Sequence, residues 1–90
     1  RIVMAEESAI EFPCEFPIKM MGRDTPAFRS TARALVEKHA GKVANDAVRE
    51  AQSRKGTFVS ITVTITATSQ RQLDAIYQDV TDHEDVLMAL

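Results

Sequence analysis

The sequence contains few of the residues on which several classes of function depend. Its single cysteine, Cys14, excludes an intramolecular disulfide, a thiolate metal site and the Cys-x-x-Cys pair of a copper chaperone. Its three glycines form no loop of the kind that cradles phosphate. No apolar run approaches the roughly 18 residues of a membrane helix and no signal peptide is apparent, so we expect a cytoplasmic protein without a membrane partner.

Charge of neither sign dominates the chain. The net charge is −2 at pH 7, whereas dedicated nucleic-acid binders carry a strong positive balance, so we expect no nucleic-acid partner. From Lys19 to Lys55, however, there are nine basic and four acidic residues, and from Leu73 to Leu90 there are five acidic residues and no basic one. This asymmetry could steer a partner or pair subunits, although a solvated surface of mixed sign is the simpler interpretation.

The stretch TFVSITVTITAT, residues 57–68, alternates between two kinds of side chain. Its odd-numbered residues from Val59 to Ala67 are apolar. Its even-numbered hydroxyl residues include Ser60, Thr62, Thr64 and Thr66. Since successive side chains of a strand point to opposite faces, the pattern predicts a strand with one buried face and one hydroxyl face. The hydroxyl face is expected to stay solvated or to contact another protein surface.

Two helices are expected to cover the buried face. Thr25 followed by Pro26 is typical of a helix start, and Gly41 is well placed to end that helix. Its apolar stripe is Phe28, Ala32, Leu35, Val36 and His39. The second helix begins with a capping box in which Ser69 and Gln72 satisfy each other's free backbone donors. Its stripe is Leu73, Ile76, Tyr77 and Val80.

Three further strands complete the expected domain. The first spans about Glu15–Met21, with Pro17 at its start or at a bulge because proline removes a ladder donor. Residues 42–53 are helix-friendly, but the turn at Gly56 favours a hairpin with a polar edge strand around Ala47–Ser53. A polar turn over residues 82–85 leads to a short last strand, VLMAL. Residues 1–13 are expected to form a mobile leader that docks only near Ile10 and Phe12, before one domain over residues 14–90.

The expected order is strand, helix, strand, strand, helix, strand. The simplest closed arrangement is an α+β, ferredoxin-like βαββαβ plait, in which two helices cover one face of a four-stranded antiparallel sheet. The first and third strands then lie at the centre of the sheet.

Several segments resemble the small bacterial YbeD-like family: EFPCEFPIKMMG, HAG, SRKGTFVSITVTITATS and DVLMAL, spread over about residues 9–90. The resemblance implies the ferredoxin-like fold and a likeness to the ACT-type regulatory domains of amino-acid enzymes. Genes of the family often lie beside lipoate biosynthesis genes, which implies a link to lipoate metabolism by association. The resemblance transfers no catalytic residue.

The best candidate for a ligand site is the loop Gly22, Arg23, Asp24 and Thr25, together with Arg29. The loop joins a central strand to a helix N-terminus, where free backbone N–H groups and the helix dipole favour an anion. Arg29 and Arg33 are a like-charged pair that does not stabilise the helix, and with Arg23 they could receive a carboxylate or phosphate. ACT-like modules also use this loop for small ligands, so the resemblance points to the same place.

No pair of residues is suited to acid–base or nucleophilic catalysis, so we expect neither an enzyme nor a cofactor. His39 is expected to pack partly buried near the helix C-terminus. His83 lies in a polar turn whose consecutive acids cannot readily converge on one metal ion. Cys14 lies beside Glu15, a setting that does not favour a thiolate.

Two relatives of this fold can also be tested on the residues. An RNA-binding sheet needs stacking aromatics, and the hydroxyl face offers only Phe58 at its end. Acylphosphatases pair an arginine with an asparagine around a phosphate loop, and this chain lacks that combination. We therefore expect a regulatory or adaptor domain that binds a small anionic ligand or a partner enzyme. The alternative is a homo-oligomerisation module that acts through the open sheet face or an edge strand without a ligand.

Overall fold

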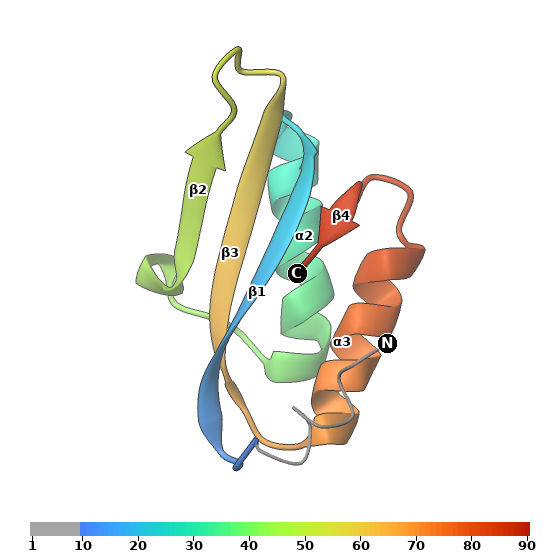
Figure 1. Ribbon diagram of the computed structural model, residues 1–90. Helices are drawn as coiled ribbons and strands as arrows, with labels where there is room; N and C mark the ends of the chain where they lie inside the picture. The colour runs from blue at the N-terminus through green and yellow to red at the C-terminus, as the bar shows by residue number, and fades with distance from the viewer. Residues whose placement is uncertain (1–9) are drawn as a thin grey trace.

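The computed structural model describes residues 10–90 and shows two layers (Figure 1). One layer is a four-stranded antiparallel sheet with the order β2-β3-β1-β4, and helices α2 and α3 cover one of its faces. The elements are β1 (Cys14–Arg23), α2 (Pro26–Ala40), the short 3-10 helix η1 (Asn45–Ala47), β2 (Val48–Gln52), β3 (Phe58–Ala67), α3 (Gln70–Asp82) and β4 (Met88–Ala89). This is the expected α+β plait, with β1 and β3 at its centre.

The pairing of β1 with β3 organises the sheet. Ten consecutive residue pairs run from Cys14 opposite Ala67 to Arg23 opposite Phe58 without a bulge. The odd-numbered apolar residues of β3 are buried under the helices, as the alternation predicts. The hydroxyl residues lie on the open sheet face, which no described helix covers.

The helical stripes complete the core. The buried members of the two stripes are Phe28, Ala32 and Val36 from α2 and Leu73, Ile76 and Val80 from α3. The Thr25 Oγ1 accepts the backbone N–H of Phe28 at 3.0 Å, and Gly41 ends α2 with a φ of 79°, so both predicted ends of α2 are confirmed.

The capping box of α3 forms with one difference from the expectation. Ser69 Oγ accepts the N–H of Gln72 at 3.1 Å, as expected. Gln72 Oε1, in turn, accepts the backbone N–H of Thr68 at 2.8 Å instead of the N–H of Ser69. The same Gln72 side chain donates to the carbonyl of His39 at 3.2 Å, so it also holds the end of α2.

The expected position of Pro17 was wrong. Pro17 is the fourth residue of β1 and pairs with Thr64 in unbroken register. The backbone groups of Lys19 and Met21 point toward β4, and by alternation those of Pro17 point to the same side. Since β4 reaches only as far as Leu90, opposite Lys19, no described ladder bond is lost at the proline.

Several boundaries also differ from the expectations. β1 is longer than Glu15–Met21, and the edge strand β2 is shorter than Ala47–Ser53 because η1 occupies the residues before Val48. Helix α3 runs through Asp82, and β4 covers only two residues of VLMAL. Of the expected leader, residues 1–9 lie outside the described residues, and Phe12 packs against the core.

Candidate functional site

Gly22 brings three elements together at the predicted ligand loop. A Cβ added to Gly22 would lie 2.5 Å from the Phe28 ring and 2.7 Å from the carbonyl oxygen of Asp85. The strand β1, the first turn of α2 and the turn before β4 can therefore meet only where a side chain is absent. Gly22 shapes the site by close packing.

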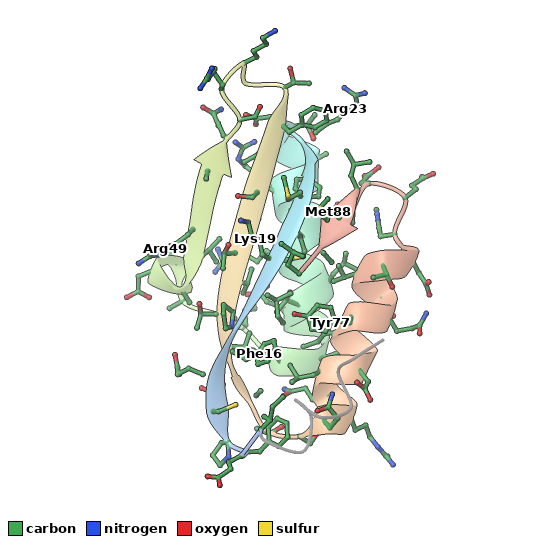
Figure 2. All side chains as sticks on the ribbon, in the orientation of Figure 1. Phe16, Lys19, Arg23, Arg49, Tyr77 and Met88 are labelled. Carbon is green, nitrogen blue, oxygen red and sulfur yellow. The ribbon has the colours of Figure 1, made fainter. Side chains whose placement is uncertain are left out.

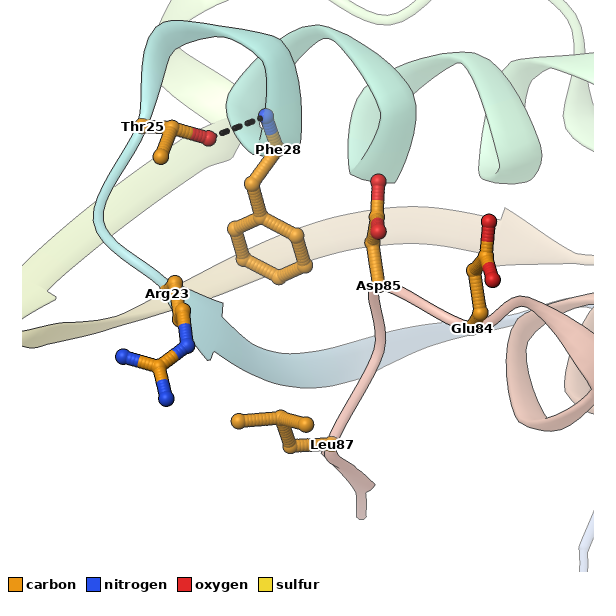
Figure 3. Close-up of a pocket in the computed structure, with 6 residues that line it drawn as sticks. All are labelled: Arg23, Thr25, Phe28, Glu84, Asp85 and Leu87. Atoms are coloured by element: carbon orange, nitrogen blue, oxygen red, sulfur yellow. Dashed lines mark hydrogen bonds between the residues drawn. The ribbon is translucent and has the colours of Figure 1, made fainter.

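A cavity of about 250 Å³ opens beside this contact, and we call it the β1 cavity (Figure 3). Its lining residues are Arg23, Thr25, Phe28, Glu84, Asp85 and Leu87. In the view of Figure 3 the Phe28 ring lies between Arg23 and Asp85, Leu87 lies below the ring, and the Arg23 guanidinium points away from the ring. Among residues 10–90, no ion pair involves the guanidinium or the two carboxylates of this cavity.

The other two charged residues of the predicted site, Asp24 and Arg29, bind each other and β2. The Arg29 guanidinium contacts the Asp24 carboxylate and donates to Glu50 Oε1 at 2.9 Å, and the Gln52 amide also donates to Asp24. The bond from Arg29, followed by that from Gln52, lowers the pKa of Asp24 below its usual value. The Asp24 carboxylate in turn raises the pKa of Arg29. We call these four residues the Asp24 network.

Arg33 does not converge with Arg23 either. Its guanidinium lies 3.2 Å from Glu37 Oε2, donates to Asn45 Oδ1 at 2.9 Å and donates to the carbonyl of Val43. Arg33 therefore fixes the connection from α2 to η1. Arg29 and Arg33 are therefore tolerated on one helix because each has its own acidic partner. Of the three arginines, only Arg23 lines the cavity.

The open sheet face is less polar than the hydroxyls of β3 alone suggest. Ser60, Thr62 and Thr64 are half-buried and Thr66 is exposed, but the register adds Met21 from β1. Met88 pairs with Met21 and Leu90 lies opposite Lys19, so both side chains of the last strand join this face. We call Met21, Phe58, Met88 and Leu90 the apolar patch. The exposed fractions of the last three are 37%, 52% and 63%.

Neither histidine forms part of the β1 cavity. His39 Nε2 lies 2.7 Å from Asp79 Oδ2, and with Lys38 it lowers the pKa of that carboxyl while joining α2 to α3. His83 Nδ1 accepts the N–H of Asp85 at 3.1 Å within the turn before β4. Over residues 10–90, no group of three His, Cys, Asp or Glu side chains is placed to hold a metal ion. No helix in that range is long and apolar enough to cross a bilayer.

The family described as "Protein of unknown function (DUF493)" matches residues 7–90. The chain belongs to this family. A UPF0250 protein of Nitrosomonas europaea, NE1487, is 42% identical over 87 residues, which cover 97% of this chain and 100% of the relative. A UPF0250 protein of Paraburkholderia phytofirmans is 42% identical over 84 residues, covering 93% of this chain and 94% of the relative. The YbeD-like resemblance is thereby confirmed.

The DUF493 fold is also found in a solved structure. The solution structure of protein HP0495 from H. pylori superposes with a TM-score of 0.72 at 18% identity, covering 100% of this chain and 94% of that one. This similarity supports the fold alone, so the function has to be argued from the residues.

Proposed function

We propose that this chain is a non-catalytic, cytoplasmic regulatory module that binds a small carboxylate ligand in the β1 cavity. The observation that carries the proposal is Arg23, which lines the cavity and has no ion-pair partner among the described residues. Its guanidinium lies 5.6 Å from the Phe58 ring, so a rotation of this exposed side chain has to bring the donors to a ligand in the cavity. A guanidinium presents a planar fork of donors that matches a carboxylate. Phe28 and Leu87 supply apolar walls for the rest of a small ligand.

The two acids of the cavity narrow the chemistry of the ligand. Glu84 and Asp85 oppose the entry of a purely anionic molecule and favour an ammonium group. A ligand that carries one carboxylate and one ammonium group satisfies both signs of charge, which is the chemistry of a free amino acid. The likeness to ACT-type domains supports a regulatory role of this kind. The association with lipoate genes supports a partner enzyme in lipoate metabolism.

Titration of the isotope-labelled protein followed by NMR tests this proposal. Leucine, 4-methylpentanoate (the same skeleton without the amine) and lipoate should be compared. We expect leucine to shift the amides of residues 22–25 and 84–85 and to bind more tightly than 4-methylpentanoate. Arg23→Gln should weaken leucine binding about tenfold, because it removes a charge-assisted bond.

The matched control is Arg54→Gln in the exposed turn between β2 and β3, which should leave binding unchanged. If none of the three compounds shifts these amides up to its solubility limit, the ligand proposal is wrong.

Homo-oligomerisation through the open sheet face is the second candidate function. The exposed apolar side chains of Phe58, Met88 and Leu90 favour it. Light scattering at high protein concentration should then report a dimer or larger species, and a monomer under those conditions contradicts this candidate.

A further inference from the structure

The rows of the open sheet face combine an apolar centre with basic residues. The register places Ala51, Ser60, Met21 and Met88 in one row across β2, β3, β1 and β4. The neighbouring row is Arg49, Thr62, Lys19 and Leu90. A shallow hollow of about 200 Å³ lies over the first row, with Lys19 and Phe58 among its lining residues. Figure 2 looks onto this face and labels four of its members, Lys19, Arg23, Arg49 and Met88.

The charged residues in the sheet rows that carry the apolar patch are all basic. Lys19, Arg23 and Arg49 are exposed, and no described residue forms an ion pair with any of them. The one carboxylate that β1 contributes to this face, Glu15, lies at the far end beside Thr66, whose hydroxyl is 3.4 Å away. Acids lie beside these rows, with Asp46 next to Arg49 in a neighbouring hollow and Glu84 and Asp85 next to Arg23 in the β1 cavity. The rows that carry the patch are nevertheless basic although the net charge of the chain is −2.

We infer that the open sheet face docks an acidic amphipathic helix of a partner protein. A helix is the element that already covers the other face of this sheet, and an apolar stripe would cover the row of Met21 and Met88. Aspartates and glutamates that flank the stripe reach Lys19 and Arg49, which lie in the neighbouring row. Charge complementarity of this kind selects the partner and its orientation.

Two other occupants fit the face less well. A second copy related by a two-fold axis would bring the basic surface against itself, and like charges oppose that contact. A single-stranded nucleic acid needs stacking platforms, and the one aromatic ring of the apolar patch, that of Phe58, already lies 5.6 Å from the Arg23 guanidinium. Both occupants are nevertheless distinguishable outcomes of the experiment.

The experiment uses two synthetic helical peptides with leucine at positions i, i+3, i+4 and i+7. One peptide carries glutamate on both sides of the stripe, and the other carries lysine at the same positions. We expect the glutamate peptide to shift the amides of Met21, Ser60, Thr62 and Met88. The lysine peptide should bind at least about tenfold more weakly, and the difference should shrink as ionic strength rises from about 0.01 M to about 1 M.

Charge reversals on the face complete the test. Lys19→Glu and Arg49→Glu should each weaken binding of the glutamate peptide about tenfold. The matched control Arg71→Glu on α3 should leave this binding unchanged. Neither Lys19 nor Arg49 lines the β1 cavity, so a failure here leaves the ligand proposal standing, and the reverse also holds. All three side chains are exposed, and an unchanged melting temperature verifies that each variant folds.

Four results would overturn the inference. The first is equal binding of the two peptides, and the second is a set of shifts that maps to the helical layer. The third is competition by an RNA homopolymer for the same amides, and the fourth is self-association through this face that Met88→Ser abolishes.

Discussion

At the scale of single residues, the two faces of β3 differ in what they tolerate. Val63 is fully buried under the helices, whereas its neighbour Thr62 lies half-buried on the open face between Arg49 and Lys19. A buried hydroxyl without a partner loses its bonds to water, while a hydroxyl at the surface keeps them. The same chemical group therefore has opposite consequences at adjacent positions.

Paired substitutions test this assignment. We predict that Val63→Thr lowers the free energy of unfolding by about 1–3 kcal/mol, because it buries an unpaired hydroxyl. Thr62→Val should change stability by less than about 0.5 kcal/mol. Urea denaturation of the two variants measures both values. The opposite ranking would mean that the faces of β3 are assigned the wrong way round.

At the scale of elements, the Asp24 network joins β2 to the start of α2. Arg29 lies in the first turn of α2, and its partners Glu50 and Gln52 of the network lie on β2. Only Val48 among the residues of β2 is even half-buried, so apolar contact contributes little to holding this edge strand. The polar network therefore adds a side-chain connection between β2 and the start of α2 to the packing of Val48 against the core.

The network predicts a pH dependence. The pKa of Asp24 is lowered in the folded state, so its contribution to stability is fully present above the unfolded value of 3.8. The contribution is lost as the pH falls through the lower folded pKa. Asp24→Asn should thus destabilise the protein at about pH 6 and make a smaller difference at about pH 3. Denaturant titrations at both pH values measure this, and an equal difference at the two values contradicts it.

Local signals in the sequence predicted the helices and the central strand. Thr25 and Ser69 lie three residues before the N–H groups that they accept, and the alternation of β3 is complete within ten residues. The site was harder to predict because its contacts are not local. Glu50 lies 21 residues from Arg29, and Met88 reaches the open face only through its register with Met21. Both the contact of Arg29 with Glu50 and the position of Met88 depend on pairing between segments that are distant in the sequence. The spacing of residues along the chain does not reveal which segments pair or in which register.

At the scale of the whole molecule, the sheet is held together unevenly. β1 and β3 pair over ten residues, whereas β4 pairs with β1 over two residues and through the flanking bonds of Leu87 and Leu90. Tyr77 of α3 adds a hydrogen bond from its hydroxyl to the carbonyl of Leu90 at 2.9 Å, and burial raises the pKa of this phenol. We therefore expect the edge that carries half of the apolar patch to open more readily than the central pair β1 and β3.

Native-state hydrogen exchange tests this difference within one strand. The Lys19 N–H donates to the carbonyl of Leu90 at 3.2 Å, while by alternation the Met20 N–H points toward β3. Opening of β4 alone exposes the first amide, whereas the second needs the central pair of strands to separate. We predict that the Lys19 amide exchanges at least about tenfold faster than the Met20 amide. Equal rates would mean that β4 leaves the sheet only when the whole domain unfolds.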